Sequence, residues 1–152
     1  MQVNYPLMSL QYIDYGTPQY KEMVKLKKTV LEKTLGIDFN TDYLKMDQDN
    51  ILLGCYDDGR LEGCCQLKRI DDKTMQLRQM AVASGLQGKG IGKVLLRFAE
   101  TLAKDQGYKR IYMHAPEASR GFYEKCGYVV YGEPFYRQGI RHLLMEKKLY
   151  NI

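Results

Sequence analysis

The fold is decided by residues 81–93, AVASGLQGKGIGK, where an expected strand ends in a glycine-rich turn that opens a long amphipathic helix. Glycines at 88, 90 and 92 remove three side chains where a backbone could approach a ligand closely. The helix that follows directs its unpaired N–H groups and the positive end of its dipole at the loop. The sequence therefore predicts an anion-binding site at this loop.

Length and composition fit a single globular domain over residues 1–152. Hydrophobic residues make up 45% and charged residues 27%, which excludes a disordered or fibrous chain. No apolar run approaches the ~20 residues of a membrane span. Residues 1–6 lack the basic and then apolar pattern of a signal peptide. We therefore expect a cytoplasmic protein.

The cysteines and histidines do not form a metal-binding pattern. The four cysteines include no C-x-x-C pair, and His114 and His142 are the only histidines, so the sequence predicts no metal site. Cys64 and Cys65 are neighbours on an expected strand and would point to opposite faces, which favours buried, reduced thiols over a bridge. The net charge of +5 suits an anionic ligand or a weak nucleic-acid contact, and it does not distinguish between the two.

Periodicity and turn residues predict a mixed arrangement of strands and helices in one α+β domain. Strands are expected at residues 7–14, 51–56, 61–68, 74–83, 110–114, 128–131 and 141–149. Helices are expected at residues 17–35, 89–106 and 116–126. The polar, acidic residues 37–49 leave open whether they form a short helix or a loop, and the last two strands are expected to join through residues 132–139.

Three motifs that are separated in the sequence point to the same protein family. Gln87, Gly90 and Gly92 have the spacing of Gln or Arg, two residues, Gly, one residue, and Gly or Ala. Residues 122–128 read FYEKCGY, and the third motif is the C-terminal segment at residues 139–147. With the order of elements, these motifs resemble the GNAT superfamily of acyl-CoA-dependent N-acyltransferases along nearly the whole chain. The resemblance implies a mostly antiparallel twisted sheet of about seven strands, splayed in the middle, with helices on both faces.

The resemblance implies that the anion is the pyrophosphate of coenzyme A and that the cosubstrate is acetyl-CoA. The backbone N–H groups that would hold it belong to Gln87, Gly88, Lys89, Gly90, Ile91, Gly92 and Lys93. Met80, Ala81 and Val82 would pair with the pantetheine arm like an added strand. Other nucleotide motifs fail on spacing, because a dinucleotide fingerprint needs glycine at position 93 and a P-loop needs glycine at position 87.

The resemblance also gives Tyr123 a role as proton donor to the leaving thiolate. Phe122 and Cys126 are four residues apart and would share the inward face of the short helix, which puts Tyr123 at its edge. Since a tyrosine pKa of ~10 exceeds a thiol pKa of ~8.5, Tyr123 should first act as a hydrogen-bond donor. Pro116 stands where many family members have a cofactor-contacting Asn, and Ser119 is the nearby candidate to replace it.

An amine that attacks a thioester must first lose a proton, since a lysine-like amine has a pKa of ~10.4. The sequence offers several candidate bases and favours none: Glu62, His114, Glu117, Asp38, Asp42 and Asp47. Gln79 is a further polar candidate but cannot act as a base. His142 is expected to be structural.

We interpret the sequence as that of an N-acetyltransferase that moves an acetyl group from acetyl-CoA to a primary amine by direct attack in a ternary complex. We expect the partner to be an amine acceptor, and we expect no binding to nucleic acid or to a membrane. The sequence leaves open whether the protein forms a homodimer. One alternative is an acyl-CoA sensor of the same fold without turnover. The other is a nucleic-acid or ribosome-binding module, which rests on net charge and tyrosine content.

Overall fold

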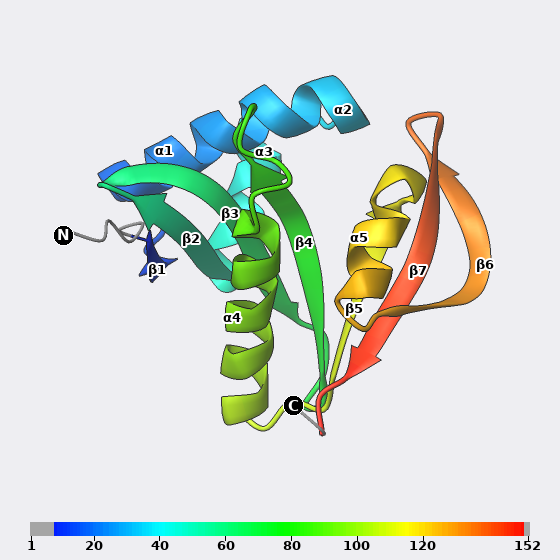
Figure 1. Cartoon of the computed structure of the whole chain (residues 1–152). Helices are drawn as coiled ribbons and strands as arrows, with labels where there is room; N and C mark the ends of the chain where they lie inside the picture. The colour runs from blue at the N-terminus through cyan, green and yellow to red at the C-terminus, as the bar shows by residue number, and fades with distance from the viewer. Residues whose placement is uncertain (1–7, 151–152) are drawn as a thin grey trace, which may run out of the picture.

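The computed structural model describes residues 8–150, so Leu7 of the first predicted strand and the N-terminal segment tested for a signal peptide lie outside the described residues. Seven strands form one open, mostly antiparallel sheet with helices on both faces, which confirms the predicted α+β architecture (Figure 1). Within residues 8–150, no helix is both long enough and apolar enough to cross a bilayer.

The sheet has the strand order β1-β2-β3-β4-β5-β7-β6, and only the β4–β5 pair is parallel. The strands are β1 (Met8–Ile13), β2 (Ile51–Asp57), β3 (Arg60–Arg69), β4 (Thr74–Val82), β5 (Arg110–Pro116), β6 (Val129–Arg137) and β7 (Ile140–Lys148). The helical segments are α1 (Pro18–Lys27), η1 (Lys28–Glu32), α2 (Lys33–Leu35), α3 (Thr41–Lys45), η2 (Met46–Asp49), α4 (Ile91–Asp105), η3 (Glu117–Ser119) and α5 (Arg120–Lys125).

The first long helix forms where the sequence predicts it, as α1, η1 and α2 in succession. Thr17 caps its start by accepting a hydrogen bond from the backbone N–H of Tyr20 at 3.2 Å, and Pro18 is its first residue. Gly36, in the left-handed conformation with φ 66°, ends it. Residues 37–49, which the sequence leaves open, fold into the short helices α3 and η2.

Two hairpins are closed by two-residue turns whose central residues both have positive φ. Asp58 and Gly59 have φ of 51° and 76°, and Gln138 and Gly139 have φ of 53° and 73°. Turns of this kind match the twist of the flanking strands. They set the β2–β3 and β6–β7 registers.

The predicted end of the strand at 128–131 is wrong. β6 continues to Arg137, and a register shift between Tyr131 and Phe135 absorbs the glycine and proline at 132–134. A bulge lets a strand resume pairing past residues that cannot join the ladder. The turn residues at 132–134 therefore mark an irregularity inside one strand.

β4 and β5 diverge along their length. Thr74–Leu77 pairs with Arg110–Met113, and beyond that point β4 follows β3 while β5 follows β7 (Figure 1). Gln79, with φ of 54°, marks a bulge in β4 where its register with β3 shifts. From Arg78 to Val82 the β5-facing edge of β4 therefore has no neighbouring strand.

The two faces of the sheet carry separate hydrophobic clusters. Cys65 belongs to the cluster under α4, whereas Cys64 belongs to the cluster under α1, as their opposite orientation on one strand predicts. Both thiols are buried and free. Burial raises the pKa of Cys64 to about 12, so this thiol stays protonated and packs as a small apolar group.

Gly63 on β3 allows the start of α4 to approach the sheet. A Cβ at this position would lie 2.7 Å from Cγ2 of Ile91 and 2.9 Å from Cδ1 of Leu95. We expect Gly63→Ala to lower the free energy of unfolding by about 1–3 kcal/mol, because the core side chains must shift. Chemical denaturation measures this change. Gly121→Ala, whose Cβ meets nothing within 4 Å, is the control, and equal stability of the two variants would contradict the expectation.

Candidate functional site

Gly92 marks the point where three distant segments of the chain meet. A Cβ at Gly92 would lie 3.1 Å from Cζ of Phe122 and 3.8 Å from Cγ2 of Val82. The end of β4, the start of α4 and α5 therefore lie against one another. These segments carry the expected pantetheine edge at 80–82 and the motifs at 87–92 and 122–128.

The glycine loop presents a row of free backbone donors. Within the described part of the chain, none of the backbone N–H groups from Gly88 to Lys93 donates a hydrogen bond, and the first N–H bonded within α4 is that of Val94, to the carbonyl oxygen of Gly90 at 3.0 Å. Gly88 and Gly90 have φ of 83° and 89°. Because L-residues rarely adopt these angles, the glycines are needed for the loop to turn its N–H groups outward. An anion fits this arrangement.

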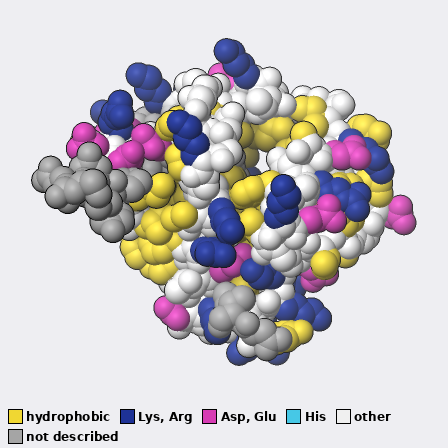
Figure 2. Space-filling model, viewed as in Figure 1, with side chains coloured by type: hydrophobic (Ala, Val, Ile, Leu, Met, Phe, Trp, Pro, Cys, Tyr) yellow, Lys and Arg dark blue, Asp and Glu magenta, His cyan; other side chains and the backbone are white. Residues whose placement is uncertain are grey.

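The residues predicted to form the anion-binding loop have different roles in the structure. The side-chain amide of Gln87 donates to the carbonyl oxygen of Val82 at 3.0 Å, so it holds the loop against the end of β4. Gly92 leaves room for the ring of Phe122, which a ligand-contact interpretation of this glycine does not anticipate. Lys89 and Lys93 are exposed at the loop and the helix start. Lys and Arg side chains gather over α4 on the face shown in Figure 2, which favours an anion there.

Met80, Ala81 and Val82 lie on the unpaired edge of β4 that leads into the loop. Ala81 is buried, while Met80 and Val82 are half-buried. An unpaired strand edge presents backbone donors and acceptors that an extended amide-containing ligand can pair with. The edge and the anion-binding loop are therefore continuous in the chain.

Tyr123 is more deeply buried than the helical spacing predicts. Its side chain is 6% exposed and belongs to the main core cluster, whereas Phe122 is 37% exposed, so the expectation that Phe122 faces inward is wrong. The short α5 begins only at Arg120, and its packing on α4 turns Phe122 toward Gly92. Burial raises the pKa of Tyr123 well above its ordinary value, so the hydroxyl keeps its proton.

The hydroxyl of Tyr123 donates to no residue that the structure describes. By contrast, the neighbouring Tyr128 donates to the Glu100 carboxylate at 2.8 Å. Tyr123 therefore combines a retained proton with an unused donor. These are the properties of a hydrogen-bond donor to developing negative charge, whereas the raised pKa makes full loss of the proton less favourable.

Three of the six candidate bases have other partners in the structure. Asp47 accepts from Lys27, and Glu117 pairs with Arg141 at 3.0 Å. Nδ1 of His114 accepts a hydrogen bond from Arg137 at 3.0 Å, because a guanidinium can only donate. Burial, followed by the charges of Arg137 and Arg78, lowers the pKa of His114.

Three other carboxylates from the sequence prediction remain. Asp38 and Asp42 are exposed. Glu62 is 9% exposed and forms no ion pair within the described range, and its backbone oxygen accepts from the N–H of Ala83 at 2.9 Å, just after β4. His142 is 4% exposed and stacks on Phe135, which supports the expected structural role. Ser119 does not cap α5 with its side chain.

A polar cavity lies on the α1 side of the sheet, beside the bulge of β4. Its volume is about 160 Å³. It is lined by Tyr43, Met46, Asp47, Asp49, Asn50, Gln66, Lys68, Arg78 and Gln79. The sequence gives no sign of this cavity, because its residues come from α3, η2, β3, β4 and the residue after η2, and share no spacing pattern. In the sequence, Gln79 and Asp47 are separate polar candidates with nothing to connect them.

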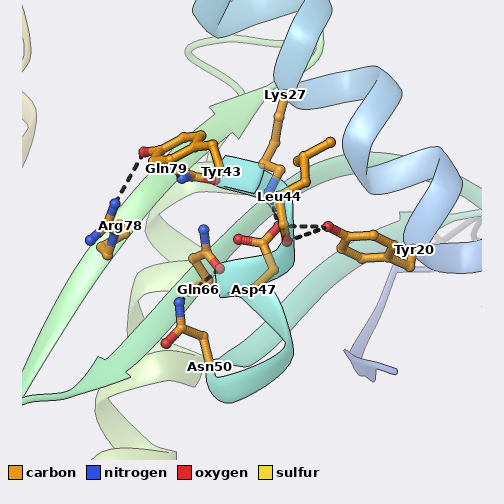
Figure 3. A network of polar contacts seen from close by, with 9 residues as sticks. All are labelled: Tyr20, Lys27, Tyr43, Leu44, Asp47, Asn50, Gln66, Arg78 and Gln79. Atoms are coloured by element: carbon orange, nitrogen blue, oxygen red, sulfur yellow. Dashed lines mark hydrogen bonds and ion pairs between the residues drawn. The ribbon is translucent and has the colours of Figure 1, made fainter. Parts of the chain in front are cut away.

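A hydrogen-bond network lines the cavity (Figure 3). The hydroxyl of Tyr43 accepts from Nη2 of Arg78 and from Nε2 of Gln79, both at 3.0 Å. Nε2 of Gln66 and Oε1 of Gln79 are buried without a hydrogen-bond partner among residues 8–150. A buried polar atom left unpaired costs about 1–3 kcal/mol, so these atoms point to a ligand or water in the cavity.

A buried ion pair holds the cavity wall to the first helix. Nζ of Lys27 lies 2.7 Å from Oδ2 of Asp47, and their side chains are 0% and 3% exposed. Tyr20 donates to the same oxygen at 2.8 Å (Figure 3). Because both partners of Asp47 come from α1, the pair fixes η2 and the preceding α3 over the sheet.

Known proteins share both the sequence pattern and the fold. A family model described as an acetyltransferase (GNAT) domain matches residues 19–149. A Bacillus subtilis (strain 168) protein named as an acetyltransferase is 35% identical over 80 residues, which are 53% of this chain and 54% of that protein. The chain spans about half the length of the curated relatives it matches.

Solved structures resemble nearly the whole chain. An N-acetyltransferase from Lactobacillus plantarum superposes with a TM-score of 0.83 at 22% identity, covering 93% of this chain and 98% of that one. A GNAT family acetyltransferase from Elizabethkingia anophelis with acetyl-CoA bound gives 0.72 at 22% identity, covering 94% and 99%. At this identity the likeness establishes the fold, and the family model adds the sequence evidence. The chain belongs to the GNAT acetyltransferase family.

Proposed function

We propose that the protein transfers an acetyl group from acetyl-CoA to a primary amine by direct attack in a ternary complex. The row of unpaired N–H groups from Gly88 to Lys93 carries the proposal, because it fits a pyrophosphate at the start of a helix. The Elizabethkingia relative, which shares the fold, holds acetyl-CoA. The unpaired edge of β4 leads directly into this loop, as a ligand with an anionic end and an amide-containing arm requires.

Each part of the site has a task in this proposal. The loop N–H groups bind the pyrophosphate, and the exposed Lys89 and Lys93 add positive charge. The edge at Met80–Val82 pairs with the pantetheine amides. Bound acetyl-CoA supplies the thioester carbon that the amine attacks. Because β4 and β5 diverge beyond Leu77, the gap between these strands leaves room for an acceptor to approach the bound thioester.

The proton balance assigns one task to Tyr123. A nitrogen–carbon bond forms, the carbon–sulfur bond breaks, and the amine loses one proton while the sulfur gains one. Tyr123 keeps its proton because of burial, and its hydroxyl is not used by the described residues. It can therefore donate a hydrogen bond to the departing sulfur. Because burial raises its pKa further above that of a thiol, the proton that the sulfur gains is the one that the amine loses, relayed through the Tyr123 hydroxyl or through solvent.

Tyr123→Phe should lower kcat at least tenfold and leave the Kd of coenzyme A within a few-fold, because it removes one donor and little packing volume. Steady-state kinetics and calorimetry measure the two quantities. Tyr136→Phe is the matched control, since Tyr136 is 72% exposed on β6. An unchanged kcat in the Tyr123 variant would remove this residue from the mechanism.

A binding role without turnover is the second candidate. The observation that favours it is that Asp47, Glu117 and His114, three of the predicted bases, already have partners. Calorimetry with coenzyme A and a free-thiol assay across a panel of primary amines separate the two. Binding with amine-dependent thiol release supports the transferase, and binding with no thiol release from any amine supports the sensor. Absence of binding would rule out both.

A further inference from the structure

We propose that the cavity beside the β4 bulge binds a carboxylate on the acceptor, so that the acceptor is a small primary amine that also bears a carboxylate, such as an amino acid. This inference rests on the proposed function for the transfer step. It goes beyond that function by naming the substrate class and Arg78 as the residue that selects it.

Arg78 is the first observation. Its guanidinium is half-buried, and it donates to the neutral hydroxyl of Tyr43 at 3.0 Å. Across residues 8–150 it forms no ion pair. A guanidinium has several N–H donors arranged in a fork that fits a carboxylate. A half-buried arginine without an acid partner is therefore a binding group for an anion.

The charge balance of the cavity points the same way. Its lining contains two acids, Asp47 and Asp49, and two bases, Lys68 and Arg78. Lys27 neutralises Asp47 from behind at 2.7 Å, and Asp49 is exposed at the rim. The cavity is thus left with an excess of positive charge, which disfavours a polycationic amine and favours an anionic group.

The buried amide of Gln66 is the third observation, whereas Oε1 of Gln79 is an acceptor and not a partner for a carboxylate. Gln66 is 0% exposed, and its Nε2 has no partner among the described residues while Oε1 accepts from Asn50 at 3.3 Å. Figure 3 shows Gln66 and Arg78 on neighbouring strands beneath Tyr43. A carboxylate oxygen can accept from both a guanidinium and an amide nitrogen. Its binding would satisfy a donor that is otherwise buried and unused.

The position of the cavity connects it to the transfer site. Gln79 lines the cavity and directly precedes Met80, the first residue of the edge proposed for the pantetheine arm. Cavities of about 150 Å³ in other proteins hold ligands of benzene size, so this one admits a carboxylate with a few carbons. An amine anchored here by its carboxylate is held beside the point where β4 leaves β5.

The experiment compares amines that differ only in the carboxylate. Phenylalanine is matched with phenethylamine and phenylalaninamide, lysine with cadaverine, and spermidine serves as a polycation. We expect at least one amino acid to have a kcat/KM at least tenfold above its decarboxylated and amidated counterparts. Arg78→Gln should raise the KM for that amino acid at least tenfold and leave the KM values of the counterparts without a carboxylate and of acetyl-CoA within twofold.

Two variants make the test specific. Arg69→Gln removes the same charge from an exposed position on β3 and should keep the carboxylate preference. Arg78→Lys keeps the charge without the fork and should recover part of the preference. The proposal would be overturned if no amino acid in the panel were preferred over its counterparts. It would also be overturned if the preference survived Arg78→Gln, or if Arg69→Gln removed it equally.

Binding measurements keep this inference separate from the proposed function. If the protein binds coenzyme A and acetylates amines without a carboxylate preference, the inference fails and the proposed function stands. If it does not bind coenzyme A, the proposed function fails. In that case, calorimetric titration of the free protein with the amino acids, compared between the unmodified protein and Arg78→Gln, still decides whether the cavity recognises a carboxylate.

Discussion

Gly90→Glu is expected to abolish coenzyme A binding and to leave the protein folded. The backbone N–H groups around Gly90 are the proposed pyrophosphate ligands, and the space beside Gly90 is open, with nothing within 4 Å of a Cβ at this position. The new carboxylate would therefore meet no protein atom at its Cβ but would repel the pyrophosphate and compete for its donors. We expect the Kd to rise at least a hundredfold, which corresponds to about 2.7 kcal/mol.

The control must separate this repulsion from backbone strain. Gly90 has φ of 89°, so any L-residue there costs about 1–2 kcal/mol of conformational strain. Gly90→Ala introduces the same strain without the charge. Calorimetry on both variants, with a thermal melt to confirm folding, isolates the effect of the carboxylate. Equal affinity of the two variants for coenzyme A would refute the assignment of the pyrophosphate to this loop.

Lys27→Met should lower the free energy of unfolding strongly. Removing the ammonium leaves the Asp47 side chain, 3% exposed, with the Tyr20 hydroxyl as the donor to its Oδ2. Breaking one partner of a buried pair costs about 3–5 kcal/mol, because the remaining charge is no longer compensated. Since a domain has only about 5–15 kcal/mol in total, the variant should unfold at much lower denaturant concentration.

A second variant tests the cause of this loss. Lys27→Met combined with Asp47→Leu removes both charges and should restore most of the stability, because apolar replacement of a buried pair is often neutral or stabilising. Tyr20 keeps an acceptor in the double variant, since its hydroxyl lies 3.3 Å from the carbonyl oxygen of Leu44. If the double variant is as unstable as Lys27→Met, lost packing rather than an unpaired charge explains the effect.

Most of the elements were predictable because their signals are local. Thr17 with Pro18, Gly36, Asp58 with Gly59, and Gly139 act through their own backbone angles or through residues a few positions away. The opposite faces of Cys64 and Cys65 follow from the two-residue period of a strand. The wrong strand end at 128–131 has the opposite cause, because the pairing partner across the sheet decides whether turn residues end a strand or form a bulge.

The sequence by itself determined the order of the elements, the glycine loop and the family, because turn angles, helix caps and motif spacing depend on residues close together in the chain. Tertiary structure alone decided that Phe122 packs on Gly92, that Tyr123 is buried with its proton, and that Lys27 occupies Asp47. It also created the cavity of Arg78, Gln66 and Tyr43. Burial, pairing of charges and the lining of a cavity depend on which distant segments meet, and no spacing within the sequence encodes that.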